Sequence, residues 1–533
     1  MQCKTCSKTY NISNEEQDFY QKISVPVPQI CPECRLIRRL CERNARYLYN
    51  RKCDFTGENI LSQYHGEHPF PVYKADIWWS DKWDAKEYGK DFDFNRPFFE
   101  QFKELKSKTP HIALFQIGGT LENSDYTNCT GYLKNCYMIS ESDYNEDCYY
   151  ANLLKKCKNV VDCSICYNNE LCYECVDCIG CYNMKYSQDC TTCQDSYFLK
   201  DCKSCHDCIG CINQYHKEFM IFNKQYSEEE YKKHLKEFAL NTNENIESLR
   251  KKAQEFFSTQ PQKHLHQENN ENSFGDHLYN SKNSKYCYDS KDLEDCMYCA
   301  KVSLGVKSSM DYNSWGDNAE LIYECSACGD NIYNLKFCTT CTTNVSNSEY
   351  CDQCTGSDSL FGCIGLKKEK FCILNKQYSE EEYKVLKEKI VEHMRNTGEY
   401  GEYFPLDICP YGYNETIAMD YFPLNENQAK EKGYRWVEKE ITHNPPTEEI
   451  LACKKCSKNY KIIPQELKFY KQMDLPIPEN CPDCRHLRRI SLRNTPNLWE
   501  KKCEKCGKDV QTTFSPDRAE KVYCEECYLQ EVV

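Results

Sequence analysis

Residues 172–181 read Cys172-Tyr-Glu-Cys175-Val-Asp-Cys178-Ile-Gly-Cys181, with a cysteine at every third position. The pattern extends to both sides, because residues 136–211 hold 15 cysteines and every interval between them is a multiple of three. A longer register of 15 residues is also present, because cysteine recurs at Cys148, Cys163, Cys178, Cys193 and Cys208. Self-similarity at a short fixed period is typical of a solenoid, in which each coil buries its interior against the next. We therefore expect about five coils of roughly 15 residues, with cysteine inside and Tyr, Asn, Asp and Lys outside.

A second cysteine-rich block runs from about residue 281 to residue 372, and its clearest part has a period of 13, set by C-x2-C pairs that begin at Cys325, Cys338 and Cys351. Both blocks close in the same nine residues, Asn-Lys-Gln-Tyr-Ser-Glu-Glu-Glu-Tyr, 152 positions apart. Each closing sequence holds a capping box, Ser227 with Glu230 and Ser379 with Glu382. It predicts a helix that covers the end of the block.

The two ends of the chain are copies of one another, related by a shift of 450 residues. Each copy carries two C-x2-C knuckles separated by 24 residues. Four thiolates in two such knuckles suit tetrahedral zinc and leave no open coordination position, so both sites are expected to be structural rather than catalytic. The predicted ligands are Cys3, Cys6, Cys31 and Cys34 at the first end and Cys453, Cys456, Cys481 and Cys484 at the second.

A further four-thiolate site follows in the C-terminal copy only, and its predicted ligands are Cys503, Cys506, Cys524 and Cys527. The equivalent N-terminal positions are Cys53, Thr56, Lys74 and Ile77, which retain one thiol of the four. We therefore expect the N-terminal copy to keep the hairpin and to lack the metal. The expected cofactor is zinc, as three ions.

The C-x2-C pair, the downstream Phe-Tyr and prolines, and the Cys-Pro-x-Cys-Arg segment with trailing basic residues resemble the "probable zinc-ribbon" domains of bacterial proteins. With the cysteine-rich middle, the order of parts is similar to that of uncharacterised cysteine-rich proteins of candidate-phylum bacteria that carry such domains at both ends. The resemblance implies a zinc fold at each end and implies no activity.

Arginines follow the second knuckle of each copy at helical spacing, while the chain as a whole has a net charge of −14. A helix face of guanidinium groups suits a phosphate backbone, and RNA is favoured over DNA. The alternatives are a solvated face or pairing with acids of the solenoid. The candidate nucleic-acid-binding residues are Arg35, Arg38, Arg39 and Arg43, and Arg485, Arg488, Arg489 and Arg493.

The 42 cysteines of this chain of 533 residues are not read as a secreted disulfide framework, because the N-terminus has no apolar signal segment. A cytoplasmic location, reduced thiols and no membrane span are expected. The solenoid thiols are interpreted first as small core residues, then as metal ligands, and last as disulfide or redox groups. No P-loop, dinucleotide fingerprint, G-x-S-x-G or H-E-x-x-H motif occurs, so we expect no enzyme, with thiol oxidoreduction the one class left open.

The expected fold is mainly β with short helices, in which zinc ribbons at both termini flank cysteine-rich β-solenoid-like blocks. The predicted function is a non-catalytic zinc-binding scaffold that recognises RNA, ribonucleoprotein or protein partners, and the alternative is a thiol or metal reservoir or a thiol-based redox protein. The expected domains are 1–110, an N-terminal ribbon module with a degenerate second ribbon and an aromatic-rich segment; 111–222, solenoid block 1; 223–272, a helical cap and polar linker; 273–374, solenoid block 2; 375–450, a helical cap and connector; and 451–533, a C-terminal double zinc ribbon.

Overall fold

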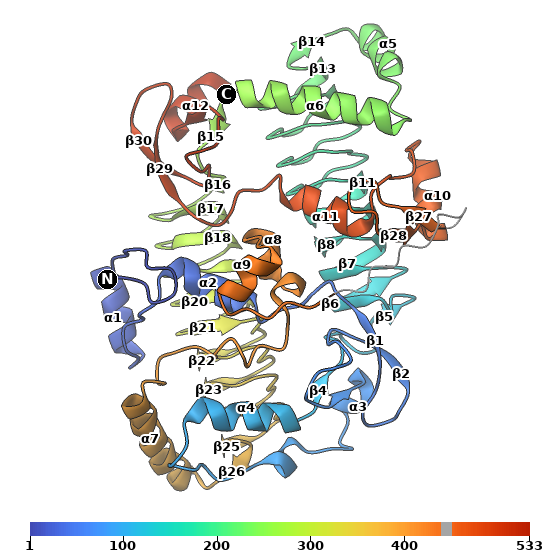
Figure 1. Ribbon diagram of the computed structural model, residues 1–533. Coiled ribbons are helices and arrows are strands. Elements are labelled where there is room, and N and C mark those ends of the chain that lie inside the picture. The colour runs from blue at the N-terminus through green and yellow to red at the C-terminus, as the bar shows by residue number, and fades with distance from the viewer. Residues whose placement is uncertain (439–449, 533) are drawn as a thin grey trace. The chain divides into compact units, whose positions relative to one another are not determined.

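A computed structural model describes residues 1–438 and 450–532, and it is rich in short β-strands with short helices between them (Figure 1). The chain forms two compact units. Unit 1 holds residues 1–113, 265–437 and 496–498, and unit 2 holds residues 114–264, 438–495 and 499–533. Each unit therefore combines one end of the chain with the cysteine-rich block that is farther from it. The six expected domain boundaries stay a prediction. Residues 439–449 of the expected connector lie outside the described residues.

Unit 1 begins with a ribbon segment and continues, after a long excursion of the chain, with a series of parallel strands and a helical tail. Its elements are α1 (Asn14–Lys22), α2 (Pro32–Leu40), β1 (Tyr49–Lys52), β2 (Asn59–Ser62), β3 (Val72–Tyr73), α3 (Ala75–Trp79), η1 (Ala85–Tyr88), α4 (Phe98–Lys108), β4 (His111–Ile112), β16 (Gln267–Glu268), β17 (Phe274–Tyr279), β18 (Lys285–Lys291), β19 (Ala300–Ser303), β20 (Met310–Gly316), β21 (Tyr323–Ser326), β22 (Tyr333–Lys336), β23 (Ser346–Glu349), β24 (Asp358–Phe361), β25 (Lys370–Ile373), β26 (Lys376–Gln377), α7 (Glu380–Thr397), η2 (Tyr413–Glu415), α8 (Ile417–Tyr421) and α9 (Glu426–Glu431).

Unit 2 begins with its parallel strands and ends with a ribbon. Its elements are β5 (Leu121–Glu122), β6 (Thr127–Lys134), β7 (Ile139–Tyr149), β8 (Asn152–Lys155), β9 (Lys158–Val161), β10 (Ser164–Tyr167), β11 (Glu170–Tyr173), β12 (His206–Ile209), β13 (Glu218–Ile221), β14 (Lys224–Gln225), α5 (Glu228–Phe238), α6 (Asn243–Thr259), β15 (Gln262–Lys263), β27 (Ile450–Ala452), β28 (Asn459–Lys461), α10 (Pro464–Gln472), α11 (Pro482–Ile490), β29 (Trp499–Lys502), β30 (Asp509–Thr512), β31 (Val522–Tyr523) and α12 (Glu525–Val532).

The strands and bridges of β5 to β14 are here called the first stack. From β5 to β13 they pair in parallel at a constant shift, and β14 closes the stack as an antiparallel partner of β13. Thr127 pairs with Ile139, and Ser164 pairs with Val176, in each case twelve positions further along the chain. The longer coil expected from the cysteine register is therefore wrong. Because twelve is also a multiple of three, the intervals between cysteines fit either coil length, and the pairing selects the shorter one.

Every third residue of the first stack has a positive φ, from Cys129 to Phe222 without a break. The residue that follows each of them is the interior one, so the dipeptide Asp-Cys recurs through the block. Asp and Asn tolerate the left-handed conformation better than other residues with a side chain. In Asp177-Cys178-Ile-Gly180-Cys181, Asp177 and Gly180 occupy the left-handed positions, with φ of 52° and 64°, and Cys178 and Cys181 point inward.

The second stack, β16 to β26, follows the same plan with a variable repeat. Met310 pairs with Tyr323 at a shift of 13, which confirms the predicted period for this part of the block. Nearer the ends the shift falls to 12 between Ser346 and Asp358 and to 11 between Phe274 and Lys285.

Helices pack at one end of each stack, as the capping boxes predict (Figure 1). Both boxes are present at the starts of α5 and α7. On the first stack, Tyr231 of α5 and Leu249 of α6 share an apolar cluster with Ile209 and Ile221. On the second stack, α7 is joined by α4, whose Phe98 ring lies 5.2 Å from that of Tyr350. The aromatic segment that precedes the first block in the chain therefore packs on the second stack.

The ribbons reproduce the 450-residue shift element by element. The hairpin β1–β2 pairs Tyr49 with Ser62, and β29–β30 pairs Trp499 with Thr512. Each ribbon also adds a short parallel strand within its own unit: β3 pairs with β4, and β31 pairs with β15. Strands β4 and β15 each follow a stack-covering helix, α4 or α6, so the two units contain the same parts in a different chain order.

Candidate metal centres and docked arginine helices

The structure brings the twelve predicted cysteine ligands together in three groups of four, and within each group the sulfur atoms lie within 4.8 Å of one another. Single S–S separations of 3.7 to 3.8 Å occur between Cys6 and Cys31, Cys456 and Cys481, and Cys506 and Cys524. One cysteine of each group is less buried than the others: Cys6, Cys456 and Cys506. These groups can hold metal ions, and four thiol donors at this spacing are compatible with zinc.

Backbone amides prepare the first cysteine of each group to act as a thiolate. The N–H of Cys31 donates to Sγ of Cys3 at 3.2 Å. Burial acts to raise the pKa of Cys453 and of Cys503, but backbone hydrogen bonds outweigh it and lower both pKa values to about 6. Because metal ligation requires the thiolate, this environment fits a bound cation.

The degenerate N-terminal ribbon keeps part of this geometry around Cys53. The N–H of Lys74 donates to Sγ of Cys53 at 3.3 Å, and Thr56 and Lys74 occupy the positions of Cys506 and Cys524. Burial acts to raise the pKa of Cys53, but hydrogen bonds from Thr56 and from the backbone outweigh burial and lower this pKa. No four-thiol group forms here among the described residues, while the hairpin persists as predicted.

The arginine helices begin at cysteines of the four-thiol groups. Cys481 is the N-cap of α11 and Cys484 lies in its first turn, and Cys31 and Cys34 hold the same places in α2. The helix direction is therefore set by the knuckle. Arginines at the fourth, seventh and eighth positions after the N-cap then share one face.

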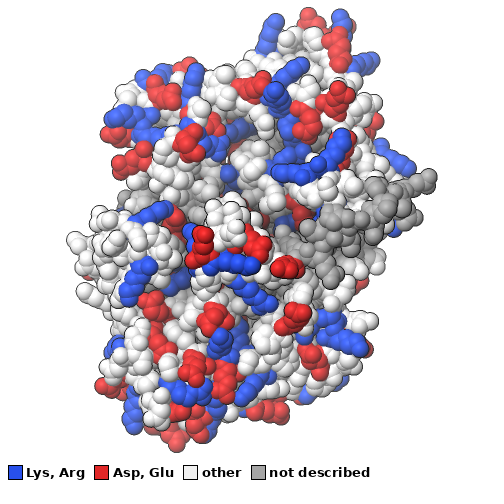
Figure 2. Space-filling view, viewed as in Figure 1, with Lys and Arg blue, Asp and Glu red and all other residues white. Residues whose placement is uncertain are grey.

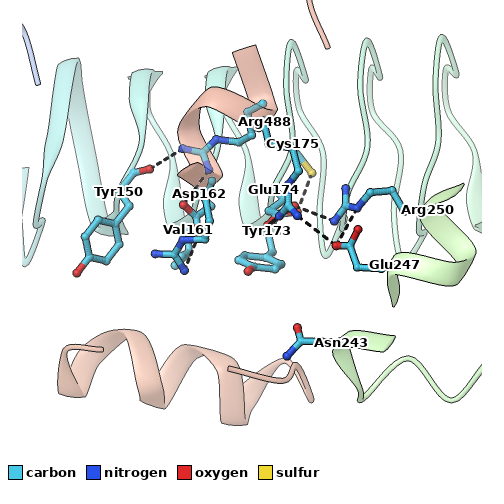
Figure 3. Close-up of polar contacts among 12 residues, drawn as sticks. Tyr150, Val161, Asp162, Tyr173, Glu174, Cys175, Asn243, Glu247, Arg250 and Arg488 are labelled. Carbon is cyan, nitrogen blue, oxygen red and sulfur yellow. Dashed lines mark hydrogen bonds and ion pairs between the residues drawn. The ribbon is translucent and has the colours of Figure 1, made fainter. Parts of the chain in front are cut away.

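In unit 2 this face meets carboxylates of the first stack. Arg485 and Arg489 both reach Asp162, at 3.1 and 2.8 Å. Arg488 pairs with Glu174, which Arg250 of α6 also reaches at 3.0 Å (Figure 3).

Around this core, Arg493, just beyond α11, pairs with Asp177 at 2.7 Å. Arg485 also bonds to Glu466 of α10 at 3.0 Å. All four predicted C-terminal arginines therefore form ion pairs.

Unit 1 repeats the arrangement with α2 and the second stack. Arg35 and Arg39 reach Asp311 at 2.8 and 3.0 Å, and Arg38 and Arg39 reach Glu324 at 2.8 and 3.1 Å. The side chains of Arg35, Arg39, Asp311 and Glu324 are fully buried. The remaining predicted arginine, Arg43, lies beyond α2, and its carbonyl accepts a hydrogen bond from the N–H of Ile417.

The carboxylates in both units obey one rule that the sequence did not reveal. Asp162 precedes Glu174 by one coil of the first stack, and Asp311 precedes Glu324 by one coil of the second. All four residues have φ between 48° and 54°, which places them at the left-handed positions just before an interior residue. Acidic residues at these left-handed positions are the feature of the sequence that could have identified the partners of the arginines.

Nucleic-acid binding by the arginine helices stays a prediction, because the structure pairs these side chains with carboxylates. Lys, Arg, Asp and Glu are interspersed over the face seen in Figure 2, where no large patch of one sign stands out. No known family model matches this chain, and no curated protein matches its sequence. The interpretation of the site therefore depends on its geometry.

The stack thiols are unbridged, and all of them except the half-buried Cys129 of β6 are buried. All 42 cysteines lie in the described residues and are free of disulfide bonds. A typical interior thiol, Cys178, is 0% exposed and donates to the carbonyl of Val176 at 3.3 Å. Among the described residues, no stack cysteine belongs to a group of three or more metal-ligand atoms at metal-binding spacing.

No helix of the described residues combines the length and the apolar character needed to cross a membrane.

Proposed function

We propose that this protein is a non-catalytic scaffold for protein recognition, built from two β-solenoids that are each clamped by a zinc-stabilised ribbon. The observation that carries the proposal is the repeated docking of a ribbon helix on carboxylates of adjacent coils, by Arg485, Arg488 and Arg489 in unit 2 and by Arg35, Arg38 and Arg39 in unit 1. The ribbons thereby act as clamps. The twelve ribbon cysteines would hold three zinc ions, which supply tetrahedral cross-links and no open position for catalysis.

Exposed ladders on the coils supply the recognition surface of this scaffold. In the second stack, Asn272 bonds to Asn283 and Asn283 bonds to Asp295, each at 3.0 Å across one coil. In the first stack, Tyr132 and Tyr144 are about half exposed, and their rings stack at 4.4 Å. Regular arrays of amide and aromatic groups along a solenoid suit an extended protein partner.

The thiol-reservoir alternative receives less support from the structure. Interior thiols such as Cys178 have no exposed surface and donate to backbone carbonyls of their own coil. This is the environment of packing residues, whereas reactive cysteines lie in exposed, electropositive surroundings.

The central experiment counts metals and thiols on the same sample. Native mass spectrometry of protein purified without chelator should give three zinc ions, and titration in denaturant with chelator should give 42 thiols. More than three metal ions, or fewer than 42 titratable thiols, would contradict the scaffold and support the reservoir or redox alternative.

A second experiment separates a protein partner from RNA. The full chain is titrated with a mixed-sequence RNA at about 50 and 200 mM salt, a range over which phosphate contacts lose orders of magnitude in affinity. We expect weak binding that is unchanged in Arg485→Gln/Arg488→Gln/Arg493→Gln. Tight, salt-sensitive binding that this variant loses would replace the protein partner by RNA.

A further inference from the structure

The first metal site of the C-terminal ribbon and the acidic face of the first stack are joined by one short helix. Cys481 and Cys484, two ligands of that site, form the N-cap and first turn of α11. Arg488 and Arg489, one to two turns further on, hold Glu174 and Asp162. An isolated helix of nine residues is far below the length that is stable in water, so α11 depends on its anchors.

We infer that the Asp162–Glu174–Asp177 face of the first stack is a docking site for an arginine-bearing helix, and that metal in the Cys453–Cys484 site decides its occupant. With metal bound, α11 fills the face. When the metal leaves, α11 unfolds and the face accepts a basic helix of a partner protein. The inference depends on metal binding at this site, as in the proposed function, and adds a partner chemistry to it.

Charge and burial explain why the vacated face would attract such a partner. Glu174 and Asp162 are 3% and 0% exposed while docked, and removal of α11 takes away arginines from both. Arg250 of α6 remains on Glu174, and Arg493, which follows α11 and pairs with Asp177, is released together with that helix. Three carboxylates on two adjacent coils of the stack, Asp162 on one and Glu174 and Asp177 on the next, would then face solvent with one arginine among them. A planar guanidinium is the best matched donor for such a surface.

The apolar part of the interface contains none of the candidate metal ligands. Phe469 and Met473 lie on or just after α10 and pack against Tyr149 and Tyr173 of the first stack. Helix α10 contains no cysteine. The metal-controlled part of the docking is therefore the arginine face of α11, rather than the whole ribbon.

The chain offers a matched pair of variants for the test. Cys456 and Cys506 are the exposed ligands of the two metal sites in the same ribbon, but only the site of Cys456 supplies the N-cap of α11. In full-length Cys456→Ser and Cys506→Ser, zinc content is measured by native mass spectrometry. Carboxyl labelling of Asp162, Glu174 and Asp177 with a water-soluble carbodiimide and glycine amide is then quantified by peptide mass spectrometry.

We expect each variant to lose one zinc ion, and labelling of the three carboxylates to rise at least tenfold in Cys456→Ser only. A peptide of twelve arginines is the binding probe, and it should bind Cys456→Ser at least tenfold more tightly than wild type. That gain should disappear when Glu174→Gln is added.

The outcomes separate this inference from the proposed function. Wild type without zinc would overturn both. Zinc present in wild type, with carboxylates that stay unlabelled in Cys456→Ser or become labelled equally in Cys506→Ser, would overturn the gated docking site and leave the zinc scaffold intact. Labelled carboxylates without a gain in binding of the arginine peptide would overturn the partner chemistry.

Discussion

Glu174 is a shared buried charge of unit 2, since Arg488 of α11 and Arg250 of α6 both reach it. Its side chain is 3% exposed. A buried carboxylate of this kind is costly to desolvate, and removal of one partner leaves the others uncompensated. Its energetic role is therefore tested better by a neutral isostere than by a count of contacts.

Glu174→Gln is expected to destabilise unit 2 by about 3–5 kcal/mol, because two guanidinium groups lose their buried counter-charge. Chemical denaturation of the full chain, followed by hydrogen exchange of peptides from unit 2, measures the effect. Glu247→Gln is the control: Glu247 contacts the same two arginines but is 53% exposed, so its change should stay below about 1 kcal/mol. Equal effects of the two substitutions would contradict a buried charge cluster.

Glu42 in unit 1 has the opposite electrostatic character. Burial raises its pKa to about 7, although Lys106 acts to lower it. A carboxyl group with a raised folded-state pKa favours folding only at low pH, and this contribution is lost as the pH rises through 7. We expect Glu42→Gln to leave stability at pH 5 nearly unchanged and to increase it at pH 8 by roughly 2–3 kcal/mol.

Thermal unfolding at pH 5 and pH 8 measures the effect of Glu42→Gln. Glu87 is exposed, so Glu87→Gln is the control and should leave the stability at both pH values unchanged. A Glu42→Gln protein with the wild-type pH profile would show that Glu42 is charged in the folded state.

At the scale of single residues, the sequence predicted which cysteines group together, but it did not identify the acidic partners of the neighbouring arginines. The grouping of Cys3, Cys6, Cys31 and Cys34 follows from spacing within a single ribbon. Asp311 lies 276 residues from Arg35, and no local pattern connects them. Pairing of the arginines with acids was one of the alternatives, but its members become identifiable only after the coils are aligned.

The elements of the first stack depend on a left-handed residue at every third position, whereas in the second stack the spacing of such residues varies. Asn168 is one such residue, with φ of 55°, and its side chain is exposed. A β-branched side chain at this position strains the backbone, while glycine does not.

Asn168→Val should therefore destabilise unit 2 by about 1–2 kcal/mol, and Asn168→Gly should have a much smaller effect. Denaturant titration of the full chain compares the two substitutions. If valine and glycine were equivalent, the left-handed position would not be a structural requirement of the coil.

The same three-residue unit explains why the coil length was mispredicted. Cysteines at multiples of three are compatible with the shorter and the longer coil alike, and Cys148 and Cys163 suggested the longer one. Interior positions that hold another residue, such as Val160 and Met184, complete the columns of the shorter coil. Those columns mix residue types, so a search for cysteine alone does not reveal them.

At the scale of the whole molecule, one group of buried carboxylates has lowered pKa values, in contrast to Glu42. In Glu174 and Glu324, burial acts to raise the pKa, and neighbouring arginines outweigh it. In Asp352, burial likewise acts to raise the pKa, and Lys106 and His111 outweigh it and lower the pKa. A lowered folded-state pKa stabilises the fold above the unfolded value near 4 and loses that contribution as the pH falls through the folded value.

From these groups, both units are therefore expected to lose stability as the pH falls from about 5 towards 2, with little change between about pH 5 and 7. Circular dichroism at a series of pH values measures the loss. Raising the salt concentration at pH 7 is the comparison, and it should have a small effect because buried pairs are weakly screened. Strong destabilisation by salt at pH 7 would mean that the pairs are solvated.

The division into two units is the feature that the sequence predicted least. Composition and repeats indicate the order of ribbon, block, block and ribbon, and each of these parts is found. Which block a ribbon joins depends on pairs such as Arg35 with Asp311 and Arg489 with Asp162, more than 270 residues apart. Both stacks present a similar pair of acidic residues on adjacent coils, Asp162 with Glu174 and Asp311 with Glu324. A ribbon assigned to the block that follows or precedes it in the chain would therefore be assigned to the wrong stack.

This crossed pairing sets a timetable for synthesis on the ribosome. Arg35 emerges 276 residues before Asp311, which at about 5–20 residues per second amounts to roughly 14–55 s of translation. During that interval the N-terminal basic helix has no acidic surface of its own unit to meet. The C-terminal helix, in contrast, emerges after the first stack is complete and can dock at once. The nascent N-terminal ribbon is therefore the part of this protein most in need of protection by a chaperone.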